Sequence, residues 1–286
     1  MKKMGNEQNT LVLLNSYYQS FSKAEKKVAD TVIGNPENAV YYSVTDLAQK
    51  ANVGETSVIR FCRKLGFRGF QDFKLSLAQD LVTPSQQVYG QIDESDDIAT
   101  ICGKMTSHNT QILEDTRTLL SSDSLEKAAM AMVSARKLHF FGVGSSGFTA
   151  SDAKYRFMRL GFHTECATDS HIIAMNCALT SPGDVVVGIS SSGSTKDLVD
   201  AMRIAKKNGA FIICLTSHAR SPITMYADVI LLTAIRENPL QGGAFSSKIA
   251  QLHALDILTT IVAVKRKDST FSALKTTAEA VLDKMY

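Results

Sequence analysis

The sequence predicts two domains of different class: an all-α domain at the N-terminus, followed by an α/β domain with a parallel sheet flanked by helices. The 286 residues exceed one typical domain of about 100–150 residues. Apolar residues follow helical spacing in the first part, whereas short apolar runs alternate with helical segments from residue 137 onward. Residues 1–80 hold 11 basic and 8 acidic side chains, so the whole net charge of +3 lies there. We therefore assign 1–80 to the first domain, 81–120 to a linker and connecting helix, and 121–286 to the second domain.

Composition excludes several classes of protein. Hydrophobic residues make up 44% and charged residues 21%, which is typical of a folded rather than a disordered chain. The five cysteines are scattered without a C-x-x-C pair, which favours reduced thiols over a disulfide or zinc framework. The apolar stretch 249–264 contains Gln251, His253 and Asp256, so we expect a buried core helix there and not a membrane span. The sequence thus predicts a cytoplasmic protein with no metal site, no bound cofactor and no membrane association.

The N-terminal residues carry helix start and stop patterns. Ser22 and Glu25 have the spacing of a capping box before a helix over 23–33. Residues 43–54 predict a short helix and a turn, and a second helix follows over 55–65. Gly66 stands where that helix needs a residue in the left-handed conformation. Together these segments predict a helix–turn–helix.

The helix over 55–65 has two faces. Its apolar stripe is formed by Val58, Phe61, Cys62 and Leu65. The opposite face carries Thr56, Ser57, Arg60, Arg63 and Lys64. Hydroxyls at the helix start and cations along it suit the DNA major groove, where Arg60 is long enough to read a guanine. The alternative is a solvated face of an ordinary helical domain.

Residues beside this helix extend the predicted DNA contact. Arg68 and Lys74 are expected to hold phosphates next to the groove. Five cations and two anions lie between Glu55 and Lys74, so the positive charge is concentrated there. Glu55 either accepts from a cytosine amino group or simply favours the helix N-terminus.

A linker over 81–89 and a connecting helix precede the second domain. A helix over 97–119 is expected to pack on its own domain or on a second subunit, and another helix is expected over 125–135. The predicted strands are 137–141, 163–166, 184–189, 210–215 and 229–232. The helices between them are predicted over 148–160, over 170–179 and from the Ser-rich loop to Asn208. Such alternation indicates right-handed βαβ units and a parallel sheet covered on both faces.

Two loops after strands are candidate ligand sites, because ligands bind outside the carboxyl ends of parallel strands. Gly142-x-Gly144-x-x-Gly147 matches a dinucleotide fingerprint, and Glu165 is expected at the tip of the second strand. That loop also contains Ser145 and Ser146. The second loop puts five hydroxyls at a helix start: Ser190, Ser191, Ser192, Ser194 and Thr195. Hydroxyls and free amides at the positive helix end suit a phosphate dianion, which favours a phosphate ligand over a nicotinamide dinucleotide.

Two stretches resemble a known family. Residues 43–66, with the run Arg60-Phe61-Cys62-Arg63-Lys64-Leu65-Gly66, resemble the helix–turn–helix of RpiR-type bacterial transcription regulators. Residues from about 120 to 265, with the Ile-Ser-x-Ser-Gly-x-Thr run at 189–195, resemble the sugar isomerase (SIS) domain, a phosphosugar-binding α/β fold. The resemblance implies a regulator that responds to a sugar phosphate effector, binds a palindromic operator as a homodimer or homotetramer, and often represses sugar catabolism genes.

The resemblance also implies roles for individual residues. Phosphate would be held by Ser190, Ser192 and Thr195, joined by Ser146, with Ser191 and the Gly193 amide lining the loop. His171, Glu237 and Lys248 are further candidates for contacts with the sugar or its phosphate. SIS domains also occur in phosphosugar isomerases, for which Glu237, His218 and His253 are the available bases. None of these stands in a motif that marks a base, and an isomerase does not need residues 22–74, so no catalytic residue is assigned.

Overall fold

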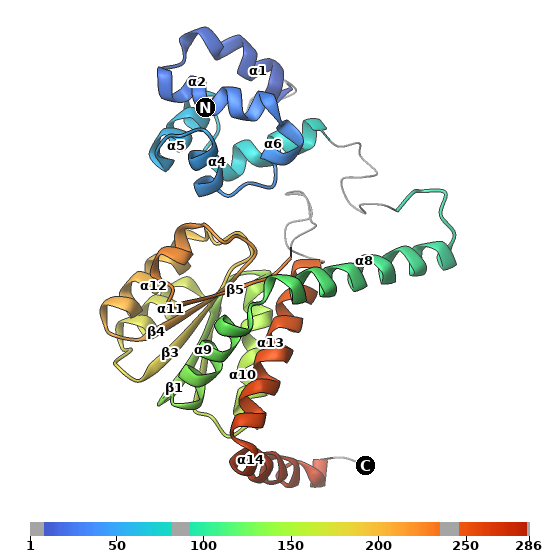
Figure 1. The fold of residues 1–286 in the computed structure, drawn as a ribbon, viewed down its shortest axis with the longest axis vertical. Coiled ribbons are helices and arrows are strands. Elements are labelled where there is room, and N and C mark those ends of the chain that lie inside the picture. The colour runs from blue at the N-terminus through green and yellow to red at the C-terminus, as the bar shows by residue number, and fades with distance from the viewer. Residues whose placement is uncertain (1–8, 82–91, 235–245, 285–286) are drawn as a thin grey trace. The chain divides into compact units, whose positions relative to one another are not determined.

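A computed structural model describes residues 9–81, 92–234 and 246–284 (Figure 1). The chain divides into two compact units, and the division falls between Ser107 and His108 within helix α8 (Ile98–Leu119). Most of the predicted linker lies outside the described residues. The two units are therefore described separately, and together they have the predicted combination of a helical domain and an α/β domain.

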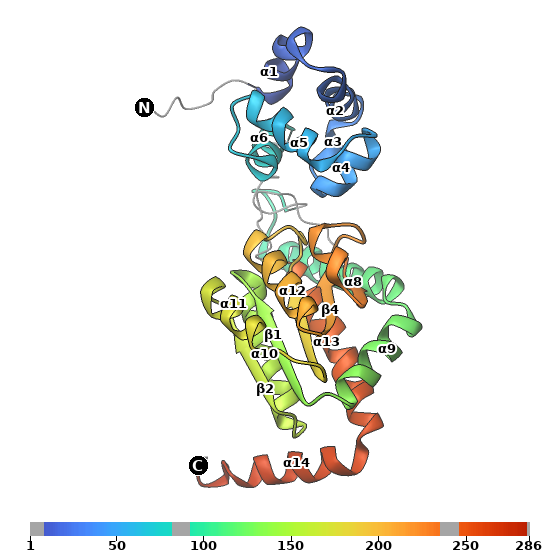
Figure 2. The ribbon, with the colours of Figure 1, turned by 90° about the vertical axis from the view of Figure 1, so that its left-hand side faces the viewer.

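The first unit is a helical bundle (Figure 2). Its helices are α1 (Thr10–Tyr17), α2 (Lys23–Gly34), α3 (Pro36–Ala39), α4 (Val44–Lys50), α5 (Glu55–Lys64) and α6 (Phe70–Leu81), with a 3-10 turn at Tyr18–Ser20. Helices α4 and α5 pack on each other and form the predicted helix–turn–helix. The core combines apolar residues from all six helices, among them Leu14, Val28, Leu47 and Phe61.

Local patterns set the helix ends in this unit as predicted. The Ser22 hydroxyl accepts from the Glu25 amide, and the Glu25 carboxylate accepts from the Ser22 amide, which completes the capping box. Gly66 has φ +94°, the left-handed conformation predicted after α5. Helix α5 ends at Lys64, one residue before the predicted end.

The second unit contains a five-stranded parallel sheet in the order β2-β1-β3-β4-β5. The strands are β1 (Lys137–Gly142), β2 (Thr164–Ala167), β3 (Asp184–Ile189), β4 (Phe211–Thr216) and β5 (Val229–Leu232). The bounds of β3 and β5 are those predicted from the sequence. Gly142 pairs with Ile189, so the loops that follow β1 and β3 begin side by side.

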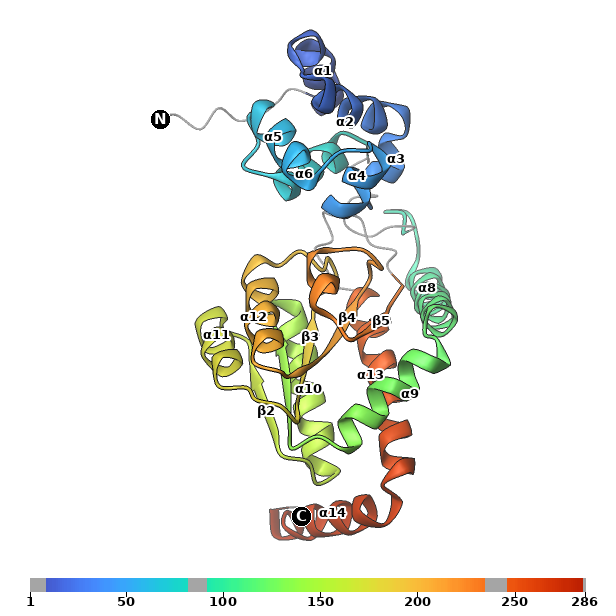
Figure 3. The ribbon, with the colours of Figure 1, turned by 60° about the vertical axis from the view of Figure 1, so that its left-hand side comes forward.

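Helices cover both faces of this sheet (Figure 3). One face is covered by α9 (Ser122–Val133), α10 (Ser145–Arg159) and α13 (Ser246–Lys265). The other is covered by α11 (Ser170–Ala178), α12 (Lys196–Lys207) and the 3-10 turn Pro222–Tyr226. Helix α14 (Lys267–Glu279) follows α13 and packs on α10 and α13, and a 3-10 turn at Leu282–Lys284 closes the described chain.

Helix α13 is the apolar stretch for which a core helix was predicted. By length and composition alone, its residues 247–265 could cross a membrane. Its fully buried residues Ala254, Leu258 and Val262 belong instead to the core on one face of the sheet. The prediction of a core helix is confirmed.

Three predicted positions need correction. Helix α9 begins at Ser122, three residues earlier than predicted, because Ser121 caps it. Helix α10 begins at Ser145 and not at Phe148, so Ser145, Ser146 and Gly147 form its first turn and not a loop. Glu165 is the second residue of β2 and not its tip, since the strand continues to Ala167.

Candidate DNA-binding helix and phosphate-binding loop

The core fixes the orientation of helix α5. Val58, Phe61 and Cys62 are fully buried, and the Phe61 ring lies 5.2 Å from the Phe21 ring and 5.6 Å from the Phe73 ring. Burial raises the pKa of the Cys62 thiol to about 12, as expected for an inert core cysteine. The apolar stripe predicted from the sequence is therefore the face by which α5 is held.

The opposite face of α5 is open to solvent. Thr56, Arg60 and Arg63 are exposed, and Ser57 is half-buried. The Arg60 guanidinium makes one long hydrogen bond, 3.4 Å, to the Ser57 hydroxyl. These four side chains form the candidate DNA-reading face.

Glu55 is engaged within the helix–turn–helix itself. The Thr45 hydroxyl of α4 donates to the Glu55 carboxylate at 2.5 Å. This bond joins the two helices across the turn, and the carboxylate lies at the start of α5, where a negative charge is favourable. Of the two roles considered for Glu55, the structure favours stabilisation of the α5 N-terminus over a contact with a cytosine amino group.

Lys64 is held against the neighbouring helix. Its ammonium donates to the Ser20 carbonyl oxygen, forms an ion pair with Glu25 at 3.1 Å and lies 5.4 Å from the centre of the Phe21 ring. Lys64 therefore anchors the end of α5 to the α2 region, which argues against its prediction as a DNA contact.

Lys74 is buried, and its prediction as a phosphate contact is wrong. The residue is 8% exposed, and its ammonium donates to the Tyr42 carbonyl oxygen at 2.9 Å. This carbonyl precedes Ser43, the capping residue of α4, so Lys74 ties α6 to the start of the helix–turn–helix. Burial lowers the pKa of Lys74 from 10.5 to about 8, against the attraction of Asp46.

Lys74 gives the folding free energy a pH dependence of definite sign. The unfolded chain keeps this proton up to the ordinary pKa of 10.5, whereas the folded chain loses it near 8, so stability from this group rises with pH in that range. Between pH 7 and pH 9 the gain is about 1 kcal/mol. We expect the free energy of unfolding of Lys74→Met to lack this increase with pH. Urea unfolding, monitored by hydrogen exchange of the backbone amides of α6, measures it. Equal pH dependence in the two proteins would contradict the assignment.

Arg68 remains a candidate phosphate contact. Its side chain is 88% exposed and pairs with Asp72 at 2.8 Å, while its backbone amide donates to the same carboxylate. These bonds lower the pKa of Asp72 and hold Arg68 at the start of α6. The guanidinium is oriented yet accessible.

The Ser-rich loop between β3 and α12 brings its hydroxyls together. The buried Ser190 hydroxyl accepts from the Gly193 amide at 3.1 Å and lies 3.2 Å from the Thr195 hydroxyl. The Ser192 hydroxyl accepts from the Ser194 amide at 3.2 Å. The loop is thus folded on itself, with four of its hydroxyl residues partly accessible: Ser191, Ser192, Ser194 and Thr195.

Gly193 is required by the shape of this loop. It has φ +59°, and a Cβ atom there would lie 2.0 Å from the Ser221 hydroxyl oxygen and 2.6 Å from the Ser221 Cβ. Only glycine fits this left-handed turn without displacing the neighbouring segment. The close packing holds the loop at the carboxyl end of β3.

The helices that follow the two loops start without side-chain caps. Asp169 caps α11 and Ser121 caps α9, whereas neither Thr195 at α12 nor Gly144 at α10 makes a capping side-chain bond. Uncapped first-turn amides and the positive helix end form an anion site. Both predicted loops therefore present helix N-termini at one edge of the sheet.

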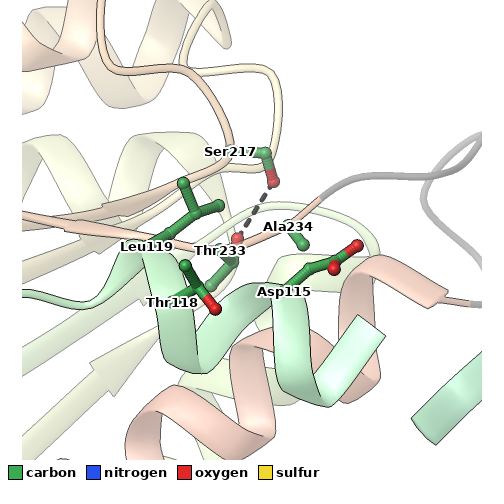
Figure 4. A pocket seen from close by; sticks show the side chains of 6 residues that line it. All are labelled: Asp115, Thr118, Leu119, Ser217, Thr233 and Ala234. Carbon is green, nitrogen blue, oxygen red and sulfur yellow. Dashed lines mark hydrogen bonds between the residues drawn. The ribbon is translucent and has the colours of Figure 1, made fainter. Parts of the chain in front are cut away.

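A pocket of about 440 Å³ is lined by residues of α8 and by residues that follow β4 and β5 (Figure 4). It is lined by Asp115, Thr118, Leu119, Ser217, Thr233 and Ala234. The hydroxyls of Ser217 and Thr233 lie 3.0 Å apart, and the Ser217 amide donates to the Ser191 carbonyl oxygen at 3.1 Å. The pocket thus adjoins the loop through this backbone bond.

The pocket residues and Gln251 were not predicted from the sequence as functional residues. Gln251, which is 2% exposed, contacts both ligand loops from α13. The presence of Gln251 inside a predicted core helix could have indicated a buried hydrogen-bond network, because buried polar side chains need partners. The pocket had no comparable clue, since α8 and the ends of β4 and β5 are far apart in sequence.

The three further sugar-contact candidates are not brought to the loop by any described contact. His171 is exposed in the first turn of α11. The Lys248 ammonium lies 5.0 Å from the centre of the Phe148 ring. Glu237 lies outside the described residues. All three remain predictions.

A helix–turn–helix with an exposed basic face, joined to an α/β domain with a candidate anion-binding loop, is the arrangement of a ligand-sensing transcription regulator. Family models agree: a helix-turn-helix domain of the rpiR family matches residues 8–84, and a SIS domain matches 131–261. The chain belongs to the RpiR family of transcription regulators.

Individual relatives extend over nearly the whole chain. An uncharacterized HTH-type transcriptional regulator of Haemophilus influenzae is 37% identical over 98% of this chain and 99% of its own length. The regulator HexR of Escherichia coli is 34% identical over 97% of this chain and 96% of its own. The solved structure of Vibrio vulnificus NanR complexed with ManNAc-6P matches with a TM-score of 0.87, at 32% identity over 97% of this chain and 99% of that one. These relatives are named as regulators, and the chain is one of them rather than an enzyme.

Proposed function

We propose that this chain represses genes of sugar or amino-sugar catabolism and that a sugar phosphate in the Ser-rich loop controls its binding to DNA. The observation that carries the proposal is the uncapped start of α12 beneath the converging hydroxyls of residues 190–195. NanR, which was solved with a sugar phosphate, supports this class of effector. Hydroxyls, amides and a helix end can hold a phosphate dianion without a cation.

The effector is expected to lie along the edge of the sheet. Its phosphate would accept bonds from the hydroxyls of Ser190, Ser192 and Thr195. Its sugar would extend past the Ser191–Ser217 backbone bond into the pocket of about 440 Å³. A pocket of this size suits a small ligand with several hydroxyls.

One helix–turn–helix per chain implies a dimer or a tetramer on DNA. Two copies would read a palindromic operator whose half-sites are about 34–36 Å apart or a multiple of that distance. Arg60 would read a base, while Thr56, Ser57 and Arg63 would contact base edges or phosphates nearby. The effector alters DNA binding only if it binds the DNA-competent and DNA-released states with different affinities.

A thermal-shift screen of sugar phosphates tests the proposal. A sugar phosphate at ten times its Kd should add about 1.4 kcal/mol to the free energy of unfolding. Inorganic phosphate and the unphosphorylated sugars are the controls and should give smaller shifts, because each occupies only part of the site. No shift with any hexose or amino-sugar phosphate would contradict the proposed effector class.

A further inference from the structure

Gln251 joins the Ser-rich loop to the first turn of α10. Its side-chain amide nitrogen lies 2.8 Å from the Ser191 hydroxyl of the Ser-rich loop and 3.3 Å from the Ser146 hydroxyl in the first turn of α10. Its side-chain oxygen lies 2.8 Å from the Thr149 hydroxyl. The three partners are 60 to 105 residues away in the sequence, so only the folded domain assembles this network.

The Gln251 amide points its oxygen at Thr149 and its nitrogen at the two serines. Thr149, which is 1% exposed, donates to the Gln251 oxygen, and the two amide hydrogens are directed at the serines. With the amide reversed, its NH₂ group would face Thr149 and its oxygen would face Ser146 and Ser191. The serine hydroxyls would then be the donors in the bonds to Gln251.

The direction of these bonds decides what the serines can offer a ligand. A hydroxyl has one hydrogen and two lone pairs. Because Ser146 and Ser191 each accept a hydrogen from Gln251, their own hydrogens remain free to donate elsewhere. A phosphate dianion only accepts hydrogen bonds, so it is served by hydroxyls held in this state.

We propose that Gln251 is a positioning residue that makes Ser146 and Ser191 hydrogen-bond donors to the effector phosphate. This inference rests on the proposed function, since it assumes an anion at the Ser-rich loop. It gives Ser146 and Ser191 a donor role and adds a core amide to the site, and it explains why a polar residue lies on the buried face of α13. Thr149 is the second member, because its hydroxyl bonds the amide oxygen in this orientation.

Gln251→Glu is the sharpest test, since it replaces the donor NH₂ with an acceptor oxygen of similar shape. The carboxylate would take the serine hydrogens and repel the phosphate, so we expect the affinity for a sugar phosphate at pH 8 to fall at least about 100-fold. Burial raises the pKa of such a carboxyl, so at pH 6 part of it is neutral and the ratio of wild-type to variant affinity should shrink. Isothermal titration at both pH values measures this ratio.

Two further variants separate positioning from mere packing. Gln251→Met keeps the volume but offers neither donor nor acceptor, so we expect a loss of about tenfold with the same ratio at both pH values. Thr149→Val keeps the shape of the side chain and releases the amide, so we expect a loss of about threefold to tenfold. Circular dichroism of each variant without ligand verifies folding, and if Gln251→Glu fails to fold, the Thr149→Val titration decides.

The outcomes are distinguishable. If the wild-type protein binds no sugar phosphate at all, the proposed function fails and this inference fails with it. If the wild type binds and a folded Gln251→Glu binds equally well, or loses affinity without recovery at pH 6, the proposed function stands and the positioning role of Gln251 is wrong. The same applies if Thr149→Val is the deciding variant and binds as the wild type does.

Discussion

Alanine at both Ser190 and Ser192 should weaken effector binding by about 3–6 kcal/mol, because each hydroxyl is proposed to donate a bond to a charged phosphate, and such a bond is worth about 1.5–3 kcal/mol. Ser190 also accepts from the Gly193 amide at 3.1 Å, so its loss removes part of the order of the loop before any ligand arrives. The operator affinity of the effector-free protein should stay near the wild-type value, since the change lies in the second unit. Titration of operator release with sugar phosphate measures the effect.

Ser269→Ala is a matched control for this experiment. Ser269 is an exposed serine of the same unit, and its hydroxyl bonds only locally, to the Arg266 carbonyl oxygen at 3.0 Å. It should leave the titration unchanged. Undiminished release of DNA by the double variant would show that the phosphate binds elsewhere and would remove the main support for the proposed effector site.

The parts of the fold that depend on neighbouring residues could be predicted from the sequence. The Ser22–Glu25 capping box, the left-handed Gly66 and the bounds of β3 follow from patterns a few residues long. The start of α10 was misplaced for a local reason as well, because the Gly142–Gly147 run was assigned to a loop. The last three residues of this run are helical. Gly142 is needed because the first turn of α10 packs against it: a Cβ there would lie 2.6 Å from the Ser146 carbonyl oxygen.

The errors that matter for function involve contacts between distant residues. Lys74 reads as an exposed cation, yet its partner is the Tyr42 carbonyl 32 positions earlier. Buried lysines are rare, so no sequence rule would have placed it in the core. The Ser-rich loop could be found because its chemistry is concentrated in six consecutive positions, whereas Gln251 acquires its role only when α13 packs beneath both loops.

The burial of Lys74 reduces the set of residues that are candidates for DNA contact. With Lys74 buried and Lys64 paired to Glu25, the remaining candidates are Thr56, Ser57, Arg60, Arg63 and Arg68. Arg60 lies on the open face of α5, while Arg68 lies at the start of α6, so the two should differ in kind. A residue that contacts a base affects one position of the operator, whereas one that contacts a phosphate affects all sequences alike.

Arg60→Ala should therefore cost about 1–3 kcal/mol on the operator and relax the base preference at one position of each half-site. Arg68→Ala should weaken binding to every sequence similarly and reduce the slope of log K against log salt by about one unit. Binding of both variants to operators with single base-pair changes, at several salt concentrations, measures the two effects together.

Lys74→Met tests whether the buried ammonium of Lys74 contacts DNA. A buried ammonium bonded to a carbonyl neutralises no phosphate, so this variant should keep the wild-type salt slope. If Arg60→Ala left every base preference unchanged, α5 would not be the recognition helix, however basic its exposed face. If Lys74→Met reduced the salt slope as Arg68→Ala is expected to, the lysine would reach DNA in the complex, and α6 would have to move away from Tyr42 when the protein binds.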